Sequence, residues 1–275
     1  MKYVHIGLQK SASTFLQEIV FPKISKLKKL EYFYNDNNTK NVKNFFYNDI
    51  VNDLSFLQKK NYLFSNEALF GLSWLHKDIY YCFKKCKEIF DKQQNIIIVI
   101  RKPSQFINSL YSQRLFQGFN LKLVNEDYKN IKLNNKKNFT SLNVKDLDYF
   151  DILEKYKSHF INVSIIKFED IHKLQTYKKI FNLNKLDIDY LKKTIDFKKK
   201  TNKSLSPFFV KLMLFLNKID KQKIYLKKIK IKDKTFSLGK IFKSLNKEKF
   251  NFLEKNSTYN LLIKKLDVKY DNYKV

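Results

Sequence analysis

The sequence predicts an α/β fold of three layers, in which a central parallel sheet lies between helices and the C-terminal third is helical. Short β-branched or aromatic runs alternate with longer segments of helical apolar spacing, the pattern of β-α-β units. One run, residues 95–100, is apolar without alternation, as expected for a strand covered on both faces. Sheets of this kind bind ligands at the carboxyl ends of their strands.

The elements follow from local composition. The β-branched and aromatic runs predict strands at residues 2–6, 62–64, 95–100 and 163–168. Apolar residues at helical spacing predict helices at residues 14–30, 42–57, 75–92, 104–119 and 147–160. Residues 120–140 are polar and rich in lysine and asparagine, which predicts a surface excursion or a lid. From His172 onward we expect helices only, with a basic loop at residues 198–206.

Composition sets the class of protein. With 275 residues, 44% hydrophobic and 16% aromatic, the chain has enough material for a core, which excludes global disorder. No apolar run approaches the roughly 18–20 residues of a membrane span, and no secretory signal is recognisable, so we expect a cytoplasmic protein. Cys82 and Cys86 lie four residues apart on a predicted helix, where we expect them to serve packing.

The formal net charge of +29 predicts affinity for an anionic partner such as nucleic acid, a membrane surface or an acidic substrate. Lysine and asparagine are abundant where glycine, alanine and arginine are scarce, as in proteins of AT-rich genomes, so much of the lysine is expected to be solvated surface. Against this background only Arg101 and Arg114 are arginines. A guanidinium grips phosphate or carboxylate at two points, which makes this segment a candidate binding site.

A second candidate follows the first strand, where the chain turns at Gly7 and a helix begins. Strand, turn and helix start present free N–H groups and a positive dipole end to a phosphate. Lys10, Ser11, Ser13 and Thr14 add an ammonium and three hydroxyls. The alternative is that the hydroxyls only cap the helix.

The two segments are expected to meet. Lys10, Glu67 and Arg101 each lie just past the end of a predicted strand and should converge on one crevice. Ser109 follows Arg101 by eight residues, about two helical turns, and so returns to roughly the same face. A ligand with two separated phosphates could be held at both ends.

The sequence around these residues resembles that of the sulfotransferases that use 3′-phosphoadenosine 5′-phosphosulfate (PAPS). Within that family it is more similar to the bacterial carbohydrate-type branch than to the animal cytosolic branch. The family's first motif, a strand followed by P-K-S/T-G-T-T, matches residues 9–14. Its second motif, Arg-x-Pro with a serine eight residues after the arginine, matches Arg101, Pro103 and Ser109. An aromatic-Glu-Asp strand end matches residues 168–170.

Other parts of the chain fit less closely. The family's sequence patterns are matched more weakly at residues 202–207 and from Phe252 to Asn260. In the first motif Gln9 replaces proline, Ala12 replaces glycine and Ser13 replaces threonine. Ala12 matters most, because a phosphate cradle often needs backbone angles that glycine tolerates best.

The resemblance implies a P-loop-like fold in a single domain, residues 1–275. Residues 1–170 would form the α/β nucleotide-binding core, and residues 171–275 would complete the acceptor site. The implied activity is transfer of the sulfuryl group from PAPS to a hydroxyl of an acceptor, a bacterial surface carbohydrate by the resemblance. The product would be 3′-phosphoadenosine 5′-phosphate (PAP). No metal and no specific nucleic acid are expected, and the basic surface is compatible with peripheral membrane association.

The resemblance also assigns roles. The 5′-phosphate beside the sulfuryl group would be held by Lys10, Ser11, Ala12, Ser13 and Thr14, and the 3′-phosphate by Arg101 and Ser109. In-line transfer leaves growing negative charge on the bridging oxygen, and a fixed ammonium with helix N–H groups stabilises it.

The acceptor hydroxyl needs a base. Glu67 is the first choice, with His76 as the fallback because its ordinary pKa suits proton transfer. The alternative for Glu67 is a helix-start carboxylate that satisfies N–H groups. His5 lies within a strand and is expected in the core, whereas His159 and His172 are expected at the surface.

Two other classes remain open. A P-loop nucleoside-triphosphate kinase would show G-x-x-x-x-G-K-[ST] and an aspartate at the end of a later strand, but Gly7 and Lys10 are not joined by a second glycine and the apolar strand is followed by Arg101. A non-enzymatic binder of nucleic acid or anionic surfaces would use the +29 charge and the 17 tyrosines. The basic residues, however, are spread along the whole chain.

Overall fold

The computed structural model describes residues 1–50, 53–71, 79–116, 120–124, 139–197, 228–231, 234–237 and 259–275, with Val210 and Leu214. Contacts group the chain into two compact units. The first comprises Met1–Arg101, Asp148–Thr201 and Lys274–Val275, and the second comprises Lys102–Leu147 and Asn202–Tyr273. Each is described by itself. The single domain predicted from the sequence, with its division at residue 170, stays a prediction.

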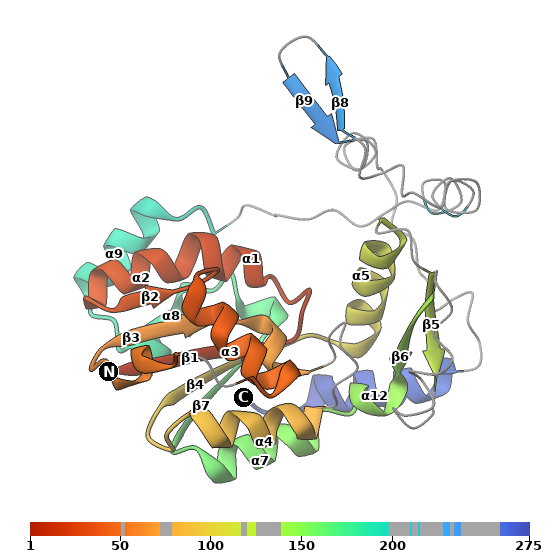
Figure 1. Cartoon of the computed structure of the whole chain (residues 1–275), viewed down its shortest axis with the longest axis horizontal. Helices are drawn as coiled ribbons and strands as arrows, with labels where there is room; N and C mark the ends of the chain where they lie inside the picture. The colour runs from red at the N-terminus through yellow and green to blue at the C-terminus, as the bar shows by residue number, and fades with distance from the viewer. Residues whose placement is uncertain are drawn as a thin grey trace. The chain divides into compact units, whose positions relative to one another are not determined.

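The first unit is built on a five-stranded sheet (Figure 1). Its strands are β1 (Lys2–Gly7), β2 (Glu31–Phe33), β3 (Tyr62–Ser65), β4 (Asn95–Ile100) and β7 (Asn162–Lys167). They run in the order β2-β3-β1-β4-β7, and every neighbouring pair is parallel. The predicted α/β class with a central parallel sheet is confirmed. Because β1 is the middle strand, the loop that follows it is flanked by the ends of β3 and β4.

Helices cover both faces of this sheet. One face carries α1 (Ser13–Phe15), α2 (Phe21–Lys28), α8 (Leu174–Phe181) and α9 (Lys185–Thr194), and the other carries α4 (Ile79–Ile89) and α7 (Phe150–His159). The unit also contains α3 (Asn37–Asn48) and the short 3-10 turns η2 (Ser55–Gln58), η3 (Glu67–Phe70) and η5 (Phe168–Asp170). The arrangement is the predicted three-layer fold.

The first helix contains a π turn, η1 (Leu16–Val20), between α1 and α2. Pro22 lies at the start of α2 directly after it. Proline has no N–H to donate to the preceding turn, and a π turn is one way in which a helix absorbs that loss. The helix predicted at residues 14–30 is therefore present, with a local irregularity that apolar spacing does not reveal.

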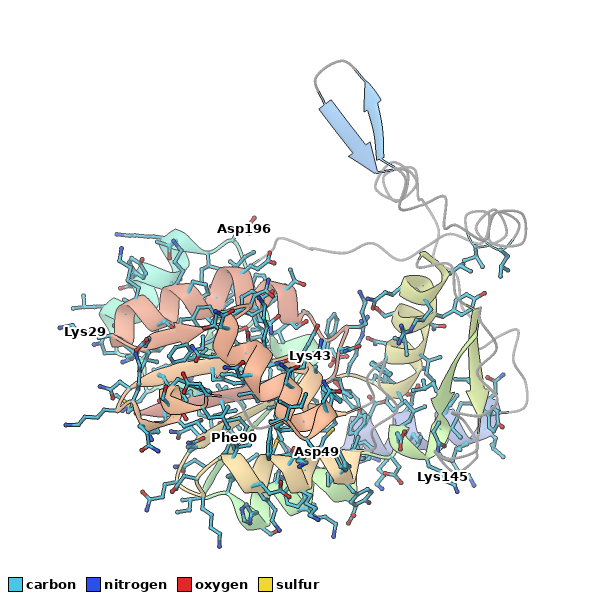
Figure 2. All side chains as sticks on the ribbon, in the orientation of Figure 1. Lys29, Lys43, Asp49, Phe90, Lys145 and Asp196 are labelled. Carbon is cyan, nitrogen blue, oxygen red and sulfur yellow. The ribbon has the colours of Figure 1, made fainter. Side chains whose placement is uncertain are left out.

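Alternate side chains of the strands fill two cores. On one face Tyr3, Ile97 and Val99 pack with Phe15 and Phe21 of the first helix. On the other face Phe64 contacts Phe90, with ring centroids 6.0 Å apart. Phe90 is labelled in Figure 2.

Cys82 and Cys86 are fully buried on α4. The hydroxyl of Tyr156, on α7, donates to Cys86 Sγ at 3.3 Å. Neither cysteine forms a disulfide, and their predicted packing role is confirmed.

The second unit contains α5 (Pro103–Phe116), η4 (Val144–Leu147), α12 (Asn260–Asn272) and two pairs of strands. The N-terminus of α5 meets two carboxylates of α12. Asp267 accepts the Ser104 N–H at 3.0 Å, and Asp271 pairs with Lys102 at 2.6 Å. Asp267 and Asp271 lie one turn apart on α12, so a single helix face anchors the start of α5.

The strands of this unit differ from the sequence predictions. The expected polar excursion at residues 120–140 includes β5 (Asn120–Val124), which pairs in parallel with β6 (Phe139–Asn143). The expectation of helices only after His172 is wrong, because β8 (Lys228–Ile231) and β9 (Lys234–Ser237) form an antiparallel hairpin. Within the described part of the C-terminal third, α8, α9 and α12 are the predicted helices.

None of the helices that the structure describes combines the length and the apolar character needed to cross a bilayer.

Candidate functional site

The site begins where β1 ends against β4. Gly7 lies so close to Val99 that an added Cβ would stand 3.1 Å from the Val99 backbone nitrogen and oxygen. The Leu8 N–H donates to the Val99 carbonyl at 3.0 Å. A side chain at residue 7 would make the backbone of β4 give by a few tenths of an ångström, so the close approach favours glycine here. The contact fixes where the following loop leaves the sheet.

The loop contains two residues with left-handed backbone. Lys10 has φ 63° and Ala12, the N-cap of α1, has φ 58° and ψ 28°. The Ser11 N–H donates back to Leu8 at 3.3 Å. Left-handed residues in a tight turn before a helix form the concave N–H arrangements that bind anions. The departure from glycine at Ala12 thus falls on a position whose backbone angles glycine tolerates best.

The predicted cradle side chains occupy different environments. Thr14 is exposed and Lys10 is half-buried. Ser11 has no exposed surface, and its Oγ has no hydrogen-bond partner among the described residues. Ser13 is 7% exposed, and its side chain acts to lower the pKa of Glu67. The structure brings these residues into one loop, and their binding of a phosphate stays a prediction.

Arg101, just past β4, is tied to this loop. Its Nη1 donates to the Lys10 carbonyl oxygen at 2.6 Å, and its guanidinium carbon lies 4.1 Å from the centre of the Phe168 ring. The Tyr149 hydroxyl donates to the Arg101 carbonyl at 2.6 Å. Three stretches singled out in the sequence, around residues 10, 101 and 168, therefore meet. Tyr149 was not predicted, because nothing in its local sequence marks a tertiary hydrogen bond.

Glu67 lies on the opposite flank of the loop, past β3. It is the first residue of η3, but Asn66 caps this turn by accepting the Ala68 N–H at 3.0 Å. The Glu67 carboxyl is therefore not needed as the cap. Burial raises its pKa, whereas the hydrogen bond from Ser13 and the charge of Lys10 act in the lowering direction. Its Oε2 is buried with no hydrogen-bond partner among the described residues.

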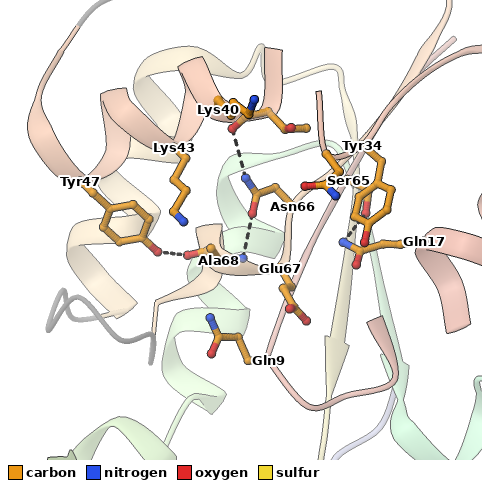
Figure 3. A pocket seen from close by; sticks show the side chains of 12 residues that line it. Gln9, Gln17, Tyr34, Lys40, Lys43, Tyr47, Ser65, Asn66, Glu67 and Ala68 are labelled. Atoms are coloured by element: carbon orange, nitrogen blue, oxygen red, sulfur yellow. Dashed lines mark hydrogen bonds between the residues drawn. The ribbon is translucent and has the colours of Figure 1, made fainter. Parts of the chain in front are cut away.

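Glu67 opens onto a pocket of about 670 Å³ (Figure 3). Most lining residues carry polar side chains, and they come from the β1 loop, the first helix, the segment before α3, α3 itself, and the end of β3 with the turn that follows. It comprises Gln9, Gln17, Tyr34, Asn35, Thr39, Lys40, Lys43, Tyr47, Ser65, Asn66, Glu67 and Ala68. Of these only Gln9 and Glu67 were singled out from the sequence. The spacing of Lys40, Lys43 and Tyr47 along one face of α3 is a signal that sequence reasoning missed.

A buried chain of hydrogen bonds lies behind the pocket. The Ser65 hydroxyl is 2.8 Å from His5 Nδ1 and accepts from Gln17 Nε2 at 3.0 Å. Burial lowers the pKa of His5 to about 3, so the imidazole is neutral at pH 7. The prediction that His5 is a core residue is confirmed. This chain fixes two pocket-lining side chains, Gln17 and Ser65, from the inside.

Other predicted residues lie elsewhere. Ser109 is on α5, in the second unit, and its action with Arg101 on one phosphate stays a prediction. His76 lies outside the described residues. His159 and His172 are half-buried rather than surface side chains. Within the part of the chain that the structure describes, no three His, Cys, Asp or Glu side chains gather as metal ligands do.

Comparison with known proteins gives one kind of match. No protein-family model matches the sequence, and no curated protein matches it. The structure is similar to the crystal structure of a sulfotransferase from Alicyclobacillus acidocaldarius, with a TM-score of 0.44 and 10% sequence identity. The similarity covers 79% of this chain and 91% of that one. A likeness of this size carries no functional argument, so function is argued from the site itself.

Proposed function

We propose that the chain is a sulfotransferase that moves the sulfuryl group of PAPS to a hydroxyl of an acceptor. The observation that carries the proposal is the loop after β1. This loop bears Lys10, hydrogen-bonds through its carbonyl to Arg101 on one flank, and faces the buried carboxyl of Glu67 on the other. A bacterial surface carbohydrate is the acceptor that the family resemblance favours.

The residues of the loop fit the phosphosulfate end of the donor. The left-handed backbone at residues 10 and 12 supplies N–H groups, and Lys10 supplies a positive charge beside them. The Ser11 hydroxyl is a buried polar group that still lacks a partner among the described residues. By the resemblance, Ser11, Ala12, Ser13 and Thr14 would hold the 5′-phosphate, and Arg101 with Ser109 would hold the 3′-phosphate.

Glu67 is proposed as the general base. Its carboxylate would take the proton of the acceptor hydroxyl as the acceptor oxygen bonds to sulfur. The bond from sulfur to the bridging oxygen breaks, and its electron pair stays on the phosphate oxygen of PAP. Lys10 and the loop N–H groups would stabilise the charge that grows on that oxygen. Because burial raises its pKa, Glu67 is a stronger base than an exposed glutamate, provided that it is ionised at the working pH.

Donor binding is tested by measuring the melting temperature of the chain with and without PAP. PAP is expected to raise the melting temperature of the whole chain, because a ligand that binds only the native state stabilises it. AMP, which lacks the 3′-phosphate, should shift it much less. Lys10→Ala should abolish most of the shift, whereas Lys26→Ala, which removes an exposed lysine from α2, should retain it. Equal shifts in both variants would show that only the net charge of +29 attracts PAP.

The test of activity is transfer of labelled sulfate from PAPS to a panel of saccharides. Transfer without added metal supports the proposal. Magnesium-dependent turnover of ATP with no response to PAP would favour the kinase alternative. A steep salt-dependent affinity for oligonucleotides, again with no response to PAP, would favour the nucleic-acid binder.

A further inference from the structure

The pocket beside Glu67 has an unusual balance of charge. Its lining contains two lysines, Lys40 and Lys43, and Glu67 is its only acidic residue. Neither lysine takes part in an ion pair among the described residues, although nine other pairs are formed there. Two positive charges therefore face at most one negative charge, and the pocket favours an anion.

The two lysines occupy defined positions. They lie three residues apart on α3, so their stems rise from neighbouring turns about 4.5 Å apart along the helix axis. The start of the helix is fixed by a capping box, in which Asp36 accepts the Thr39 N–H at 2.9 Å and the Thr39 hydroxyl accepts the Asp36 N–H at 2.9 Å.

The same helix is tied to the segment that carries Glu67. The Tyr47 hydroxyl donates to the Ala68 carbonyl, and Asn66 Nδ2 donates to the Thr39 carbonyl at 3.4 Å (Figure 3). These contacts lie on both sides of Glu67 in the sequence. The helix that carries the two exposed lysines and the segment that carries the proposed base are therefore held in one frame. A ligand that reaches both is selected by the distance between its two groups.

The rest of the lining suits a sugar. Gln9 carries an amide, which can donate to and accept from hydroxyl groups, whereas the amides of Gln17 and Asn66 already bond within the protein. Tyr34 adds an aromatic ring with a polar tip. The volume of about 670 Å³ is that of an ordinary small-molecule site and exceeds what a single inorganic anion would fill.

We propose that this pocket takes an acidic saccharide, with one hydroxyl at Glu67 and a carboxylate or sulfate of the same or the adjoining sugar against Lys40 and Lys43. This inference rests on the proposed function, since Glu67 there receives the acceptor. It adds that the acceptor is already anionic before transfer. A carboxylate and a sulfate share the chemistry that the two ammonium groups recognise, and the experiment below separates them.

Calorimetric titration of the whole chain in the presence of PAP tests the inference without turnover. The probes are a glucose tetrasaccharide, the same tetrasaccharide oxidised to carboxylates at C6, and the same tetrasaccharide sulfated at C6. We expect either acidic form to bind about tenfold more tightly than the neutral form, and the tighter one identifies the anionic group. The preference should shrink as salt is added, because charges at an open pocket are screened over about 8 Å at physiological ionic strength.

The variants are Lys40→Gln, Lys43→Gln and the double variant, with Lys26→Gln on α2 as the matched control. The double variant should bind the acidic and neutral forms about equally, and the control should keep the tenfold preference. Equal binding of all probes by the parent, or a preference that survives the double substitution, would overturn the inference. The response of the melting temperature to PAP reports separately on the proposed function, so the two can fail independently.

Discussion

The two flanks of the β1 loop are built in opposite ways. On the β4 flank, the Arg101 guanidinium donates to the Lys10 carbonyl at 2.6 Å and stacks on Phe168 at 4.1 Å. On the β3 flank, Glu67 keeps a buried oxygen without a partner among the described residues and opens onto a pocket of about 670 Å³. One flank holds its charged group against a backbone carbonyl and an aromatic ring, and the other places its charged group beside a cavity.

This difference separates support from chemistry. A buried polar atom without a partner costs stability, and such costs tend to be retained where a ligand or a proton is handled. Arg101 stabilises the left-handed backbone of the loop, whereas Glu67 carries the carboxylate that we propose accepts the proton. The substitutions below should therefore change donor binding on one flank and acceptor chemistry on the other.

The largest effect is expected at Glu67. The Glu67→Gln substitution keeps the shape and removes the base, so transfer should fall by about 10²–10⁴-fold while the affinity for PAP is retained. Single-turnover transfer from labelled PAPS measures the first quantity, and calorimetry measures the second. Glu31→Gln, at the exposed Lys59 pair, is the control and should leave both unchanged. Unimpaired transfer would assign the base elsewhere, with His76 next.

The same substitution should change stability with pH. The pKa of Glu67 in the folded chain is raised above its ordinary 4.5, so the native state binds this proton more tightly than the unfolded state does. The stability contributed by this group is present below about pH 4.5 and is lost as pH rises through the folded pKa. Glu67→Gln should therefore melt higher than the parent at pH 7, with no difference near pH 4. A lower melting temperature of Glu67→Gln at pH 7 would contradict burial as the main cause of the raised Glu67 pKa.

On the other flank, Arg101→Ala should weaken PAP binding by about 10–100-fold. One hydrogen bond to a charged group is worth about 1.5–3 kcal/mol, and the loop loses its donor to Lys10. Arg101→Lys should recover only part of the affinity, because an ammonium lacks the planar fork. Titration of PAP measures both variants. Full affinity in Arg101→Lys would show that only the positive charge at this position matters. The proposed support of the loop by the planar guanidinium would then be wrong.

The sequence predicted a feature when its residues differed clearly from the average composition of the chain. The strands at residues 62–64 and 95–100 stood out as apolar runs, whereas β2 (Glu31–Phe33) is a three-residue edge strand with no run to detect. Arg101 stood out because arginine is scarce. Lys40 and Lys43 were hidden by the abundance of lysine, and the Lys-Ile alternation of β8 was hidden in the same way.

The missing details of the site have another cause. The partner of Arg101 is a backbone carbonyl, and every residue has one, so no residue type marks it. The burial that raises the Glu67 pKa is likewise set by packing around the pocket. Motif spacing therefore located the loop and its two flanks, but it could not say which flank lies beside the pocket.

The backbone of the loop gives a smaller effect. Ala12→Gly removes the cost of a left-handed L-residue, about 1–2 kcal/mol, but adds entropy to the unfolded chain, so we expect a net gain of about 0.5–1 kcal/mol. Ala12→Val should lose about 1–2 kcal/mol, because a β-branched residue resists this conformation. Urea unfolding measures both.

The control for Ala12 is Lys29→Gly, at a left-handed residue that ends α2. It should gain similar stability with no change in PAP affinity, whereas Ala12→Val should also weaken PAP binding. If Ala12→Val binds PAP as well as the parent does, the left-handed turn is not part of the donor site.

The smallest effect is expected at Tyr34, on the acceptor flank. Burial raises its pKa, and the charges of Glu18 and Glu67 raise it further, so its hydroxyl lies within electrostatic reach of the proposed base. Tyr34→Phe should raise KM for the acceptor about three- to tenfold, the worth of one neutral hydrogen bond of about 0.5–1.5 kcal/mol, and leave PAP affinity unchanged. Steady-state kinetics with a varied acceptor measures it.

Tyr32 supplies the matched control for Tyr34. The two rings stack with centroids 6.1 Å apart, but the Tyr32 hydroxyl donates inward to the Gln17 carbonyl at 2.8 Å. Tyr32→Phe should therefore lower the melting temperature and leave the acceptor KM unchanged. Equal effects of the two substitutions on KM would mean that the stacked pair acts only as packing, and the acceptor flank would then be recognised through Glu67 and the lysines of α3 alone.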